Sequence, residues 1–189
     1  MTREGRSRRR RESAALTALI RFCTSSEELD PLTREGLPVV ENQRMMLDLQ
    51  FHRIVFNVLV APFTSRKQDH DASGARFAAL PALPLTGGVI EIDSLLDNQY
   101  SSVHLVCRLC YRLLKQMIKG SPVFAAKLSP FIPYMYSQDG LKLHVADTML
   151  AIFTDNPLLP NHVYRTAADH YVKLLKGKSR SAGYVKFLS

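Results

Sequence analysis

The segment from Val103 to Ile118 is the feature that most restricts how this chain can fold. Its sequence is VHLVCRLCYRLLKQMI, and its apolar residues recur every three or four positions, as on one face of an α-helix. The basic residues Arg108, Arg112 and Lys115 fall mostly off that face. An apolar stripe this wide must be covered by other elements. The pattern therefore predicts a helix in an all-helical packing module and does not indicate a catalytic site.

Length and composition are those of an ordinary globular domain. The chain has 189 residues, of which 46% are apolar and 22% charged, enough for one domain with a substantial core. The longest uncharged apolar stretches, such as Ile54–Phe63, are much shorter than the roughly 20 residues that a bilayer-spanning helix needs. We therefore expect no direct membrane contact in this segment.

Positive charge is concentrated at the N-terminus. Six arginines against two glutamates give the first twelve residues a charge of +4, and the rest of the chain carries the other half of the formal +8. This distribution argues against nucleic acid as a partner, because a nucleic-acid-binding face concentrates Lys and Arg along folded elements. We expect residues 1–12 to be a disordered basic tail, with a nuclear-import or acidic-partner signal as the alternative.

The cysteines indicate a reducing compartment. Cys23, Cys107 and Cys110 are an odd number with no disulfide framework. The basic N-terminal segment is followed by a short mixed run without the cleavage pattern of a secretory signal. We therefore expect the domain to face the cytosol.

Periodicity and stop signals predict the remaining elements. The expected helices cover residues 13–24, about 40–61, about 98–119, 141–153, 161–176 and 182–188. Residues 123–136 are expected to form one short helix plus a turn, because Pro130 and Pro133 interrupt the segment. Gly120 is placed as a helix stop, with Ser121 as the N-cap and Pro122 as the first residue of the next helix. A polar loop is expected at 25–38, and an insertion loop at 62–97, where any strand at Val89–Ile92 would lack a partner.

The last periodic segment leaves apolar side chains without a covering element. Tyr184, Phe187 and Leu188 lie in the helix predicted at 182–188, directly before the final residue. A helix that ends there lacks its packing partner. We therefore expect the chain to be truncated at its C-terminus, as a fragment of something larger.

Four segments, in order, resemble the ryanodine receptor and inositol trisphosphate receptor homology (RIH) domain of intracellular calcium-release channels. They are Glu41–Phe63, Val103–Met135, Gly140–Leu159 and Ala167–Ser189. The first is similar to the opening helix of the family with its aliphatic run, and the last contains GYVKFL, which resembles a Tyr-Ile-Lys-Phe-Leu segment. Pro122–Ala125 departs from the Asn-Gln pair usual in the family, which removes the polar network of that pair and leaves the helical fold.

The resemblance implies an all-α fold: an armadillo-like α-solenoid of antiparallel helices over residues 13–189, interrupted by the insertion at 62–97. It implies a cytosolic module of a tetrameric calcium channel of the inositol trisphosphate or ryanodine receptor type, which relays conformational change to the pore for calcium ion transport. The implied location is the cytosolic face of the endoplasmic reticulum or another internal membrane. The implied partners are neighbouring solenoid segments and subunits.

The resemblance assigns no enzyme activity, cofactor or ligand-contact residue to this chain. The β-trefoil with which the family grips inositol trisphosphate, the pore helices and the selectivity filter have no counterpart in the sequence. The alternative function is a free-standing armadillo-type adaptor whose arginine tail and helical groove bind an acidic protein partner. An enzyme is the third alternative.

One pattern has the composition of a metal site. His104, Cys107 and Cys110 form H-x-x-C-x-x-C along a helix. Residues six apart lie about 9 Å apart along a helix axis, too far for one tetrahedral ion to bind all three. We interpret the cysteines as buried apolar residues and predict no metal site.

The remaining ionisable residues are interpreted as structural. His144, His162 and His170, with Asp147, Asp155 and Asp169 nearby, are expected to have surface or capping roles rather than acid–base roles. A set of cations is expected to form a solvated helix face, with an inositol phosphate or an acidic subunit surface as the alternative contact. This set is Lys115, Lys119, Lys127, Lys173, Lys176, Lys178 and Arg180.

Overall fold

The computed structural model describes residues 3–64, 90–176 and 185. Their regular structure is almost entirely helical, which confirms the predicted all-α class. The α-helices are α1 (Arg3–Cys23), α2 (Val40–Asp48), α3 (Phe51–Val60), α4 (Ser101–Ile118), α5 (Pro122–Ala126), α6 (Ile132–Ser137), α7 (Val145–Phe153) and α8 (Asn161–Lys176). Short 3-10 helices occupy Ala61–Phe63 (η1), Ile92–Leu96 (η4), Asn98–Tyr100 (η5) and Ser129–Phe131 (η6). A two-residue antiparallel ladder pairs β1 (Thr24–Ser25) with β2 (Leu37–Pro38).

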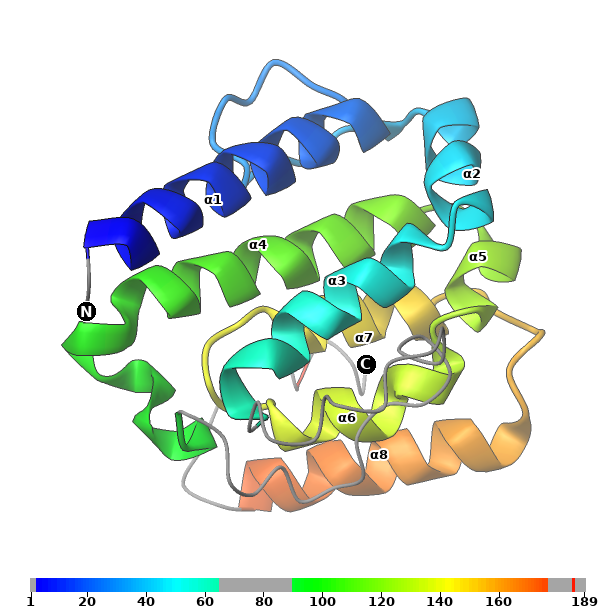
Figure 1. The fold of residues 1–189 in the computed structure, drawn as a ribbon. Helices are drawn as coiled ribbons and strands as arrows, with labels where there is room; N and C mark the ends of the chain where they lie inside the picture. The colour runs from blue at the N-terminus through cyan, green and yellow to red at the C-terminus, as the bar shows by residue number, and fades with distance from the viewer. Residues whose placement is uncertain (1–2, 65–89, 177–184, 186–189) are drawn as a thin grey trace, which may run out of the picture.

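Helix α4 is the centre of the fold, as its apolar stripe predicts. Twelve of its 18 residues are buried. In Figure 1, α1 lies along one side of α4 and runs parallel to it, whereas α3 crosses another side and runs in the opposite direction. Helices α5 and α7 also contact α4. The antiparallel arrangement expected for neighbouring helices therefore holds for α3 and α4 but not for α1 and α4.

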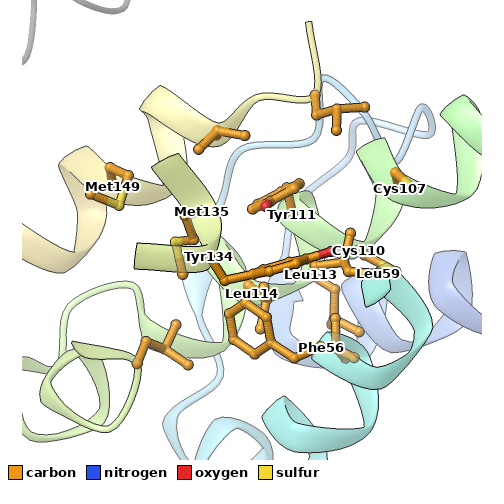
Figure 2. Packing of buried hydrophobic residues seen from close by; sticks show 14 of the residues in the cluster. Phe56, Leu59, Cys107, Cys110, Tyr111, Leu113, Leu114, Tyr134, Met135 and Met149 are labelled. Atoms are coloured by element: carbon orange, nitrogen blue, oxygen red, sulfur yellow. The ribbon is translucent and has the colours of Figure 1, made fainter. Parts of the chain in front are cut away.

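Aromatic and aliphatic side chains from three helices form the core beside α4. Figure 2 shows Phe56 of α3, Tyr134 of α6 and Leu114 of α4 gathered in one cluster. The ring of Phe56 stacks on Phe131 with centroids 4.1 Å apart and meets Tyr134 edge-on at 6.2 Å. Such aromatic pairs add to the free energy gained from burying their area.

The single helix predicted at about 40–61 is in fact two helices. Gln50 adopts a left-handed conformation (φ +55°) between α2 and α3 and so interrupts the hydrogen-bond ladder. The break lets each helix turn its own apolar face inward, with Met46 and Leu47 buried from α2 and Phe56 and Leu59 from α3. Residues 61–63 then form η1, where Pro62 stops the helical pattern as expected.

Two other predicted helices are shorter or interrupted. Residues 123–136 are expected to form one short helix plus a turn, interrupted at Pro130 and Pro133. They form α5, η6 and α6, because neither proline can donate to the ladder. The helix predicted from residue 141 begins at Val145, since Lys142 and His144 have positive φ values of +57° and +66°. The helix predicted at 161–176 matches α8.

The N-terminal residues differ from the expected disordered tail. Helix α1 runs without a break from Arg3 to Cys23, across the boundary predicted at residue 12. Alanine, arginine and glutamate favour helix, and Leu16, Ile20 and Cys23 are buried on the packed side of α1. A helix anchored by these contacts can propagate through good helix formers toward its N-terminus.

The turn between α4 and α5 is formed as the sequence predicts. Gly120 has φ +78°, the left-handed conformation that suits glycine after a helix. The Ser121 hydroxyl accepts a hydrogen bond from the Phe124 N–H at 3.5 Å, and Pro122 is the first helical residue.

Parts of the predicted organisation lie outside the described residues. These are most of the insertion expected at 62–97 and nearly all of the segment at 182–188. At the edges of the insertion, the Ile90 N–H donates to the Pro62 carbonyl at 3.2 Å, and η4 begins at Ile92. Among the described helices, none is both long enough and apolar enough to cross a membrane.

Candidate functional site at the strap between α1 and α2

Residues 24–38 join α1 to α2, and we call this segment the strap. It is organised around the buried guanidinium of Arg34. Its Nε donates to the Thr24 hydroxyl at 3.1 Å and its Nη2 to the Thr24 carbonyl at 3.0 Å, while Nη1 donates to the Glu28 carbonyl. The Thr24 hydroxyl in turn donates to the Ile20 carbonyl at 2.9 Å. Arg34 therefore binds the far end of the strap to the end of α1.

Gly36 allows the two ends of the strap to approach closely. A Cβ atom at this position would lie 2.1 Å from the Ser25 carbonyl oxygen and 2.8 Å from the Ser26 Cβ. Only glycine fits such an approach of two backbone segments. The pairing of β1 with β2 follows, with Thr24 opposite Pro38.

The strap docks on the C-terminal half of α4 through Glu35. Its Oε1 accepts a hydrogen bond from Lys115 Nζ at 2.6 Å and forms an ion pair with Arg112 Nη2 at 2.9 Å, and its Oε2 accepts a hydrogen bond from Lys119 Nζ at 3.0 Å. The Arg112 side chain is 5% exposed, and that of Glu35 is 48% exposed. One carboxylate thus binds three cations at the C-terminal end of α4, of which Arg112 is the most buried.

Backbone contacts strengthen this docking. The Arg34 carbonyl accepts hydrogen bonds from Arg112 Nη2 and from Gln116 Nε2, the latter at 3.1 Å. Lys119 Nζ also donates to the Gly36 carbonyl at 2.9 Å. Arg112 and Gln116 belong to α4 and Lys119 directly follows its last residue, so strap residues 34–36 are bound to the C-terminal end of this helix.

The electrostatics of Glu35 follow from its three partners. Partial burial alone would raise the pKa of Glu35, but hydrogen bonds from Lys115 and Lys119 and the charge of Arg112 outweigh it and lower the pKa to about 2. The carboxylate is therefore ionised at neutral pH. The cations also lie in the last turns of α4, where the helix dipole favours positive charge.

A second polar cluster joins α4 to the start of α7. Arg108 Nη2 lies 3.1 Å from His144 Nε2, and His144 Nδ1 lies 3.3 Å from Asp147 Oδ2. Because Arg108 can only donate, Nε2 of His144 accepts and its Nδ1–H donates to Asp147. The hydrogen bond from His144 lowers the pKa of Asp147 despite its partial burial, and Lys115 and Arg112 act in the same direction. The Thr148 hydroxyl donates to the Tyr111 carbonyl at 3.0 Å.

The C-terminal end of α4 is also bound by α2. Gln43 of α2 is buried and donates from Nε2 to the carbonyl of Gln116 at 2.7 Å and to that of Lys119 at 3.1 Å. These carbonyls belong to the end of α4, where the helix leaves acceptors unpaired. Both the strap and α2 therefore hold this end of the central helix.

The cysteines of the H-x-x-C-x-x-C pattern are buried apolar residues, as expected. Cys107 and Cys110 are at most 1% exposed, and burial raises the pKa of the Cys107 thiol to about 12. His104 Nε2 instead bonds to the Leu141 carbonyl at 2.8 Å. No group of His, Cys, Asp and Glu in the described part of the chain is arranged to hold a metal ion.

The predicted histidine roles hold in part. His162 is exposed at the start of α8, as expected. His170 is paired with Asp139, at 3.4 Å, rather than with its neighbour Asp169, and its ring stacks on Tyr136 at 4.1 Å. It therefore contributes to the contact between α8 and the α6 region.

The predicted cation set divides into two groups. Lys115 and Lys119 bind Glu35 of the same chain, so a solvated face is the wrong description for them. Lys127, Lys173 and Lys176 are exposed, as a solvated face requires. The other two members, Lys178 and Arg180, lie outside the described residues.

Sequence reasoning missed Arg34, Glu35 and Gly36. They stand in a polar loop with no motif around them, and their partners on α4 are about 80 positions away in the chain. Chemically, these strap residues and their partners pair opposite charges and join the strap to α4. It places no activated nucleophile or acid–base pair in a cleft.

The comparison with known families agrees with this architecture. The family model described as the RIH domain matches residues 13–189 of the chain. That match begins within α1 and includes the described helices that follow, as far as α8. The chain therefore belongs to the RIH domain family, the family of the ryanodine receptor and inositol trisphosphate receptor calcium-release channels.

Proposed function

We propose that this chain is a cytosolic, armadillo-like solenoid module of an intracellular calcium-release channel and that it relays conformational change toward the pore. Membership of the RIH domain family carries the proposal. In this function the module catalyses no reaction and requires no cofactor. Its partners are neighbouring solenoid segments and subunits of a tetramer, on the cytosolic face of the endoplasmic reticulum or another internal membrane.

The packing around α4 supports a mechanical role. A relay needs a stiff element that contacts several others, and α4 is an 18-residue helix in contact with α1, α2, α3, α5 and α7. Packed interfaces shift between discrete arrangements rather than deforming continuously. In the proposed relay, a displacement of the strap or of α7 is transmitted along α4 because both are bonded to its side chains or backbone.

Cell fractionation is the first test of the proposal. An antibody raised against residues 66–88 would be used to probe soluble and membrane fractions of the source cells. The proposal predicts a membrane-bound band many times larger than 21.3 kDa. A soluble band near that mass would instead support the adaptor that binds an acidic protein partner.

The second test measures calcium release. Cells lacking the gene would be re-supplied with the natural full-length protein, wild type or with Glu35→Lys, and stored calcium would be followed with a luminal dye. Charge reversal places a fourth cation among three and should alter release. Asp169→Asn, on an exposed position of α8, is the matched control and should leave release unchanged. Equal release from all three proteins would contradict the relay.

A further inference from the structure

Helix α8 is packed against the rest of the fold through few of its residues. Only Ala167 and Tyr171 of its 16 residues are buried, whereas 12 of the 18 residues of α4 are. In Figure 1, α8 lies at the opposite edge of the fold from α1. Its other apolar contacts with the core come from partly buried side chains, those of Val163, Tyr164, Leu174 and Leu175. Because buried apolar area is the main force that holds a helix on a domain, α8 is held more weakly than α4.

The first turn of α8 is anchored to the loop that follows α7. The Tyr164 hydroxyl donates to the Asn156 carbonyl at 2.6 Å, and its ring meets Phe153 edge-on with centroids 5.1 Å apart. Asn156 is itself buried and donates from Nδ2 to the Ile152 carbonyl at 2.8 Å. The start of α8 is therefore joined to the end of α7.

A second anchor lies further along α8, at His170. The His170 ring stacks on Tyr136 with centroids 4.1 Å apart, and its Nε2 lies 3.4 Å from Asp139 Oδ2. The Asp139 side chain is only 4% exposed. Through His170, α8 thus contacts an aromatic ring and a nearly buried carboxylate of the α6 region.

Two opposing effects act at this second anchor. Burial of a carboxylate costs free energy, because its oxygens lose water. The polar contact with His170 and the stacking on Tyr136 offset that cost while α8 is docked. When α8 leaves, water replaces His170 at Asp139 Oδ2, and this hydration offsets part of the free energy lost with the contacts. The anchor therefore favours the docked position only modestly.

We propose that residues 167–176 of α8 form a detachable segment, which opens from the fold as a unit while α4 stays folded, and that the contact of His170 with Tyr136 and Asp139 sets how often it opens. The Tyr164 anchor keeps the first turn of α8 in place. A detached segment of about ten residues is too short to remain helical in water, so its amides lose their hydrogen bonds. The opening is a property of this chain alone and does not depend on the channel function proposed above.

Native-state amide hydrogen exchange on the 189-residue chain tests the proposal. Exchange would be followed at residues 168–174 of α8 and 106–117 of α4 in increasing urea, below the unfolding transition. The α8 amides should exchange roughly a hundredfold or more faster than those of α4 and share one opening. Their common urea dependence should be smaller than that of α4, because the slope scales with the surface exposed. Exchange of α8 only through global unfolding, or amide by amide without urea dependence, would overturn the proposal.

His170→Ala tests the second anchor, with His162→Ala as the matched control. Both variants replace a histidine of α8 by alanine, the better helix former, but His162 is exposed at the start of the helix. The opening constant of the detachable segment should be roughly tenfold or more larger in His170→Ala than in the control, because a polar contact and a ring contact are lost together. Exchange in α4 should match the wild type in both. Equal opening constants in the two variants, or an equal rise of exchange in α4, would refute the role of His170.

Discussion

Replacement of Arg34 by lysine should destabilise this protein far more than its conservative chemistry suggests. Three nitrogens of the guanidinium bind three acceptors at once: the hydroxyl and carbonyl of Thr24 and the carbonyl of Glu28. Lysine offers one nitrogen on a flexible stem and cannot reproduce the planar fork. A single nitrogen cannot occupy the positions of all three guanidinium nitrogens, so at least one of the three acceptors would lose its partner.

The magnitude follows from the burial of the site. A hydrogen bond from a charged donor is worth about 1.5–3 kcal/mol, and water can partly replace the partner of the exposed Glu28. We therefore expect Arg34→Lys to lower the free energy of unfolding by about 2–4 kcal/mol. Domains are stable by about 5–15 kcal/mol, so the variant should still fold. With a urea slope of about 2–3 kcal/mol/M, its midpoint should fall by about 1 M.

Urea unfolding followed by far-UV circular dichroism measures this loss. The control is Arg44→Lys on α2, whose side chain is 75% exposed and lies 3.7 Å from Asp48. An exposed pair of this kind contributes at most about 1 kcal/mol, so the control should scarcely move the midpoint. If Arg34→Lys costs no more than Arg44→Lys, the guanidinium does not organise the strap.

Three further predictions concern the strap, the core and the thiols. Gly36→Ala should lower the free energy of unfolding by about 2 kcal/mol or more in a urea titration, because the added Cβ would lie 2.1 Å from the Ser25 carbonyl; an unchanged midpoint would show that the strap is loose there. Burial, together with the charges of Arg53 and Lys127, lowers the pKa of His52 to about 4. The neutral His52 side chain therefore contributes fully to stability above about pH 6.5, and this contribution is lost as the pH falls toward 4. His52→Phe should flatten that dependence in unfolding midpoints measured at neutral pH and near the lowered pKa, and a parallel decline in both proteins would refute the assignment. The three cysteines should react with a disulfide reagent only after unfolding, because all are buried; rapid labelling of the native protein would contradict the packing.

The sequence predicts those elements whose signals are local. Helices α4 and α8 follow from apolar periodicity, and the turn between α4 and α5 follows from Gly120, Ser121 and Pro122. The break between α2 and α3 has no such signal, since neither glycine nor proline stands at Gln50. Its cause is tertiary: two apolar faces must point into different parts of the core.

The site is harder to predict, because its chemistry depends on partners that are distant in the chain. Periodicity assigns Arg112 to the polar side of α4 and indicates no partner for it. In the fold, Arg112 is 4% exposed and Gln116 is fully buried, since the strap covers that side. A loop without a motif thus determines whether charged residues of a helix face solvent or form an interface.

Because the strap covers the polar side of α4, the basic residues on that side form contacts within the protein. A polar helix face that meets only water tolerates substitution, since exposed charges interact weakly. Arg112 instead donates to the Arg34 carbonyl and forms an ion pair with the Glu35 carboxylate while nearly all of its surface is buried, so its removal deprives both groups of a buried partner. Arg112 directly follows Tyr111 in the chain, and the Tyr111 carbonyl accepts a hydrogen bond from the Thr148 hydroxyl of α7. Any movement that separates the strap from α4 must therefore break contacts of the residue that directly follows the α7 anchor in the chain.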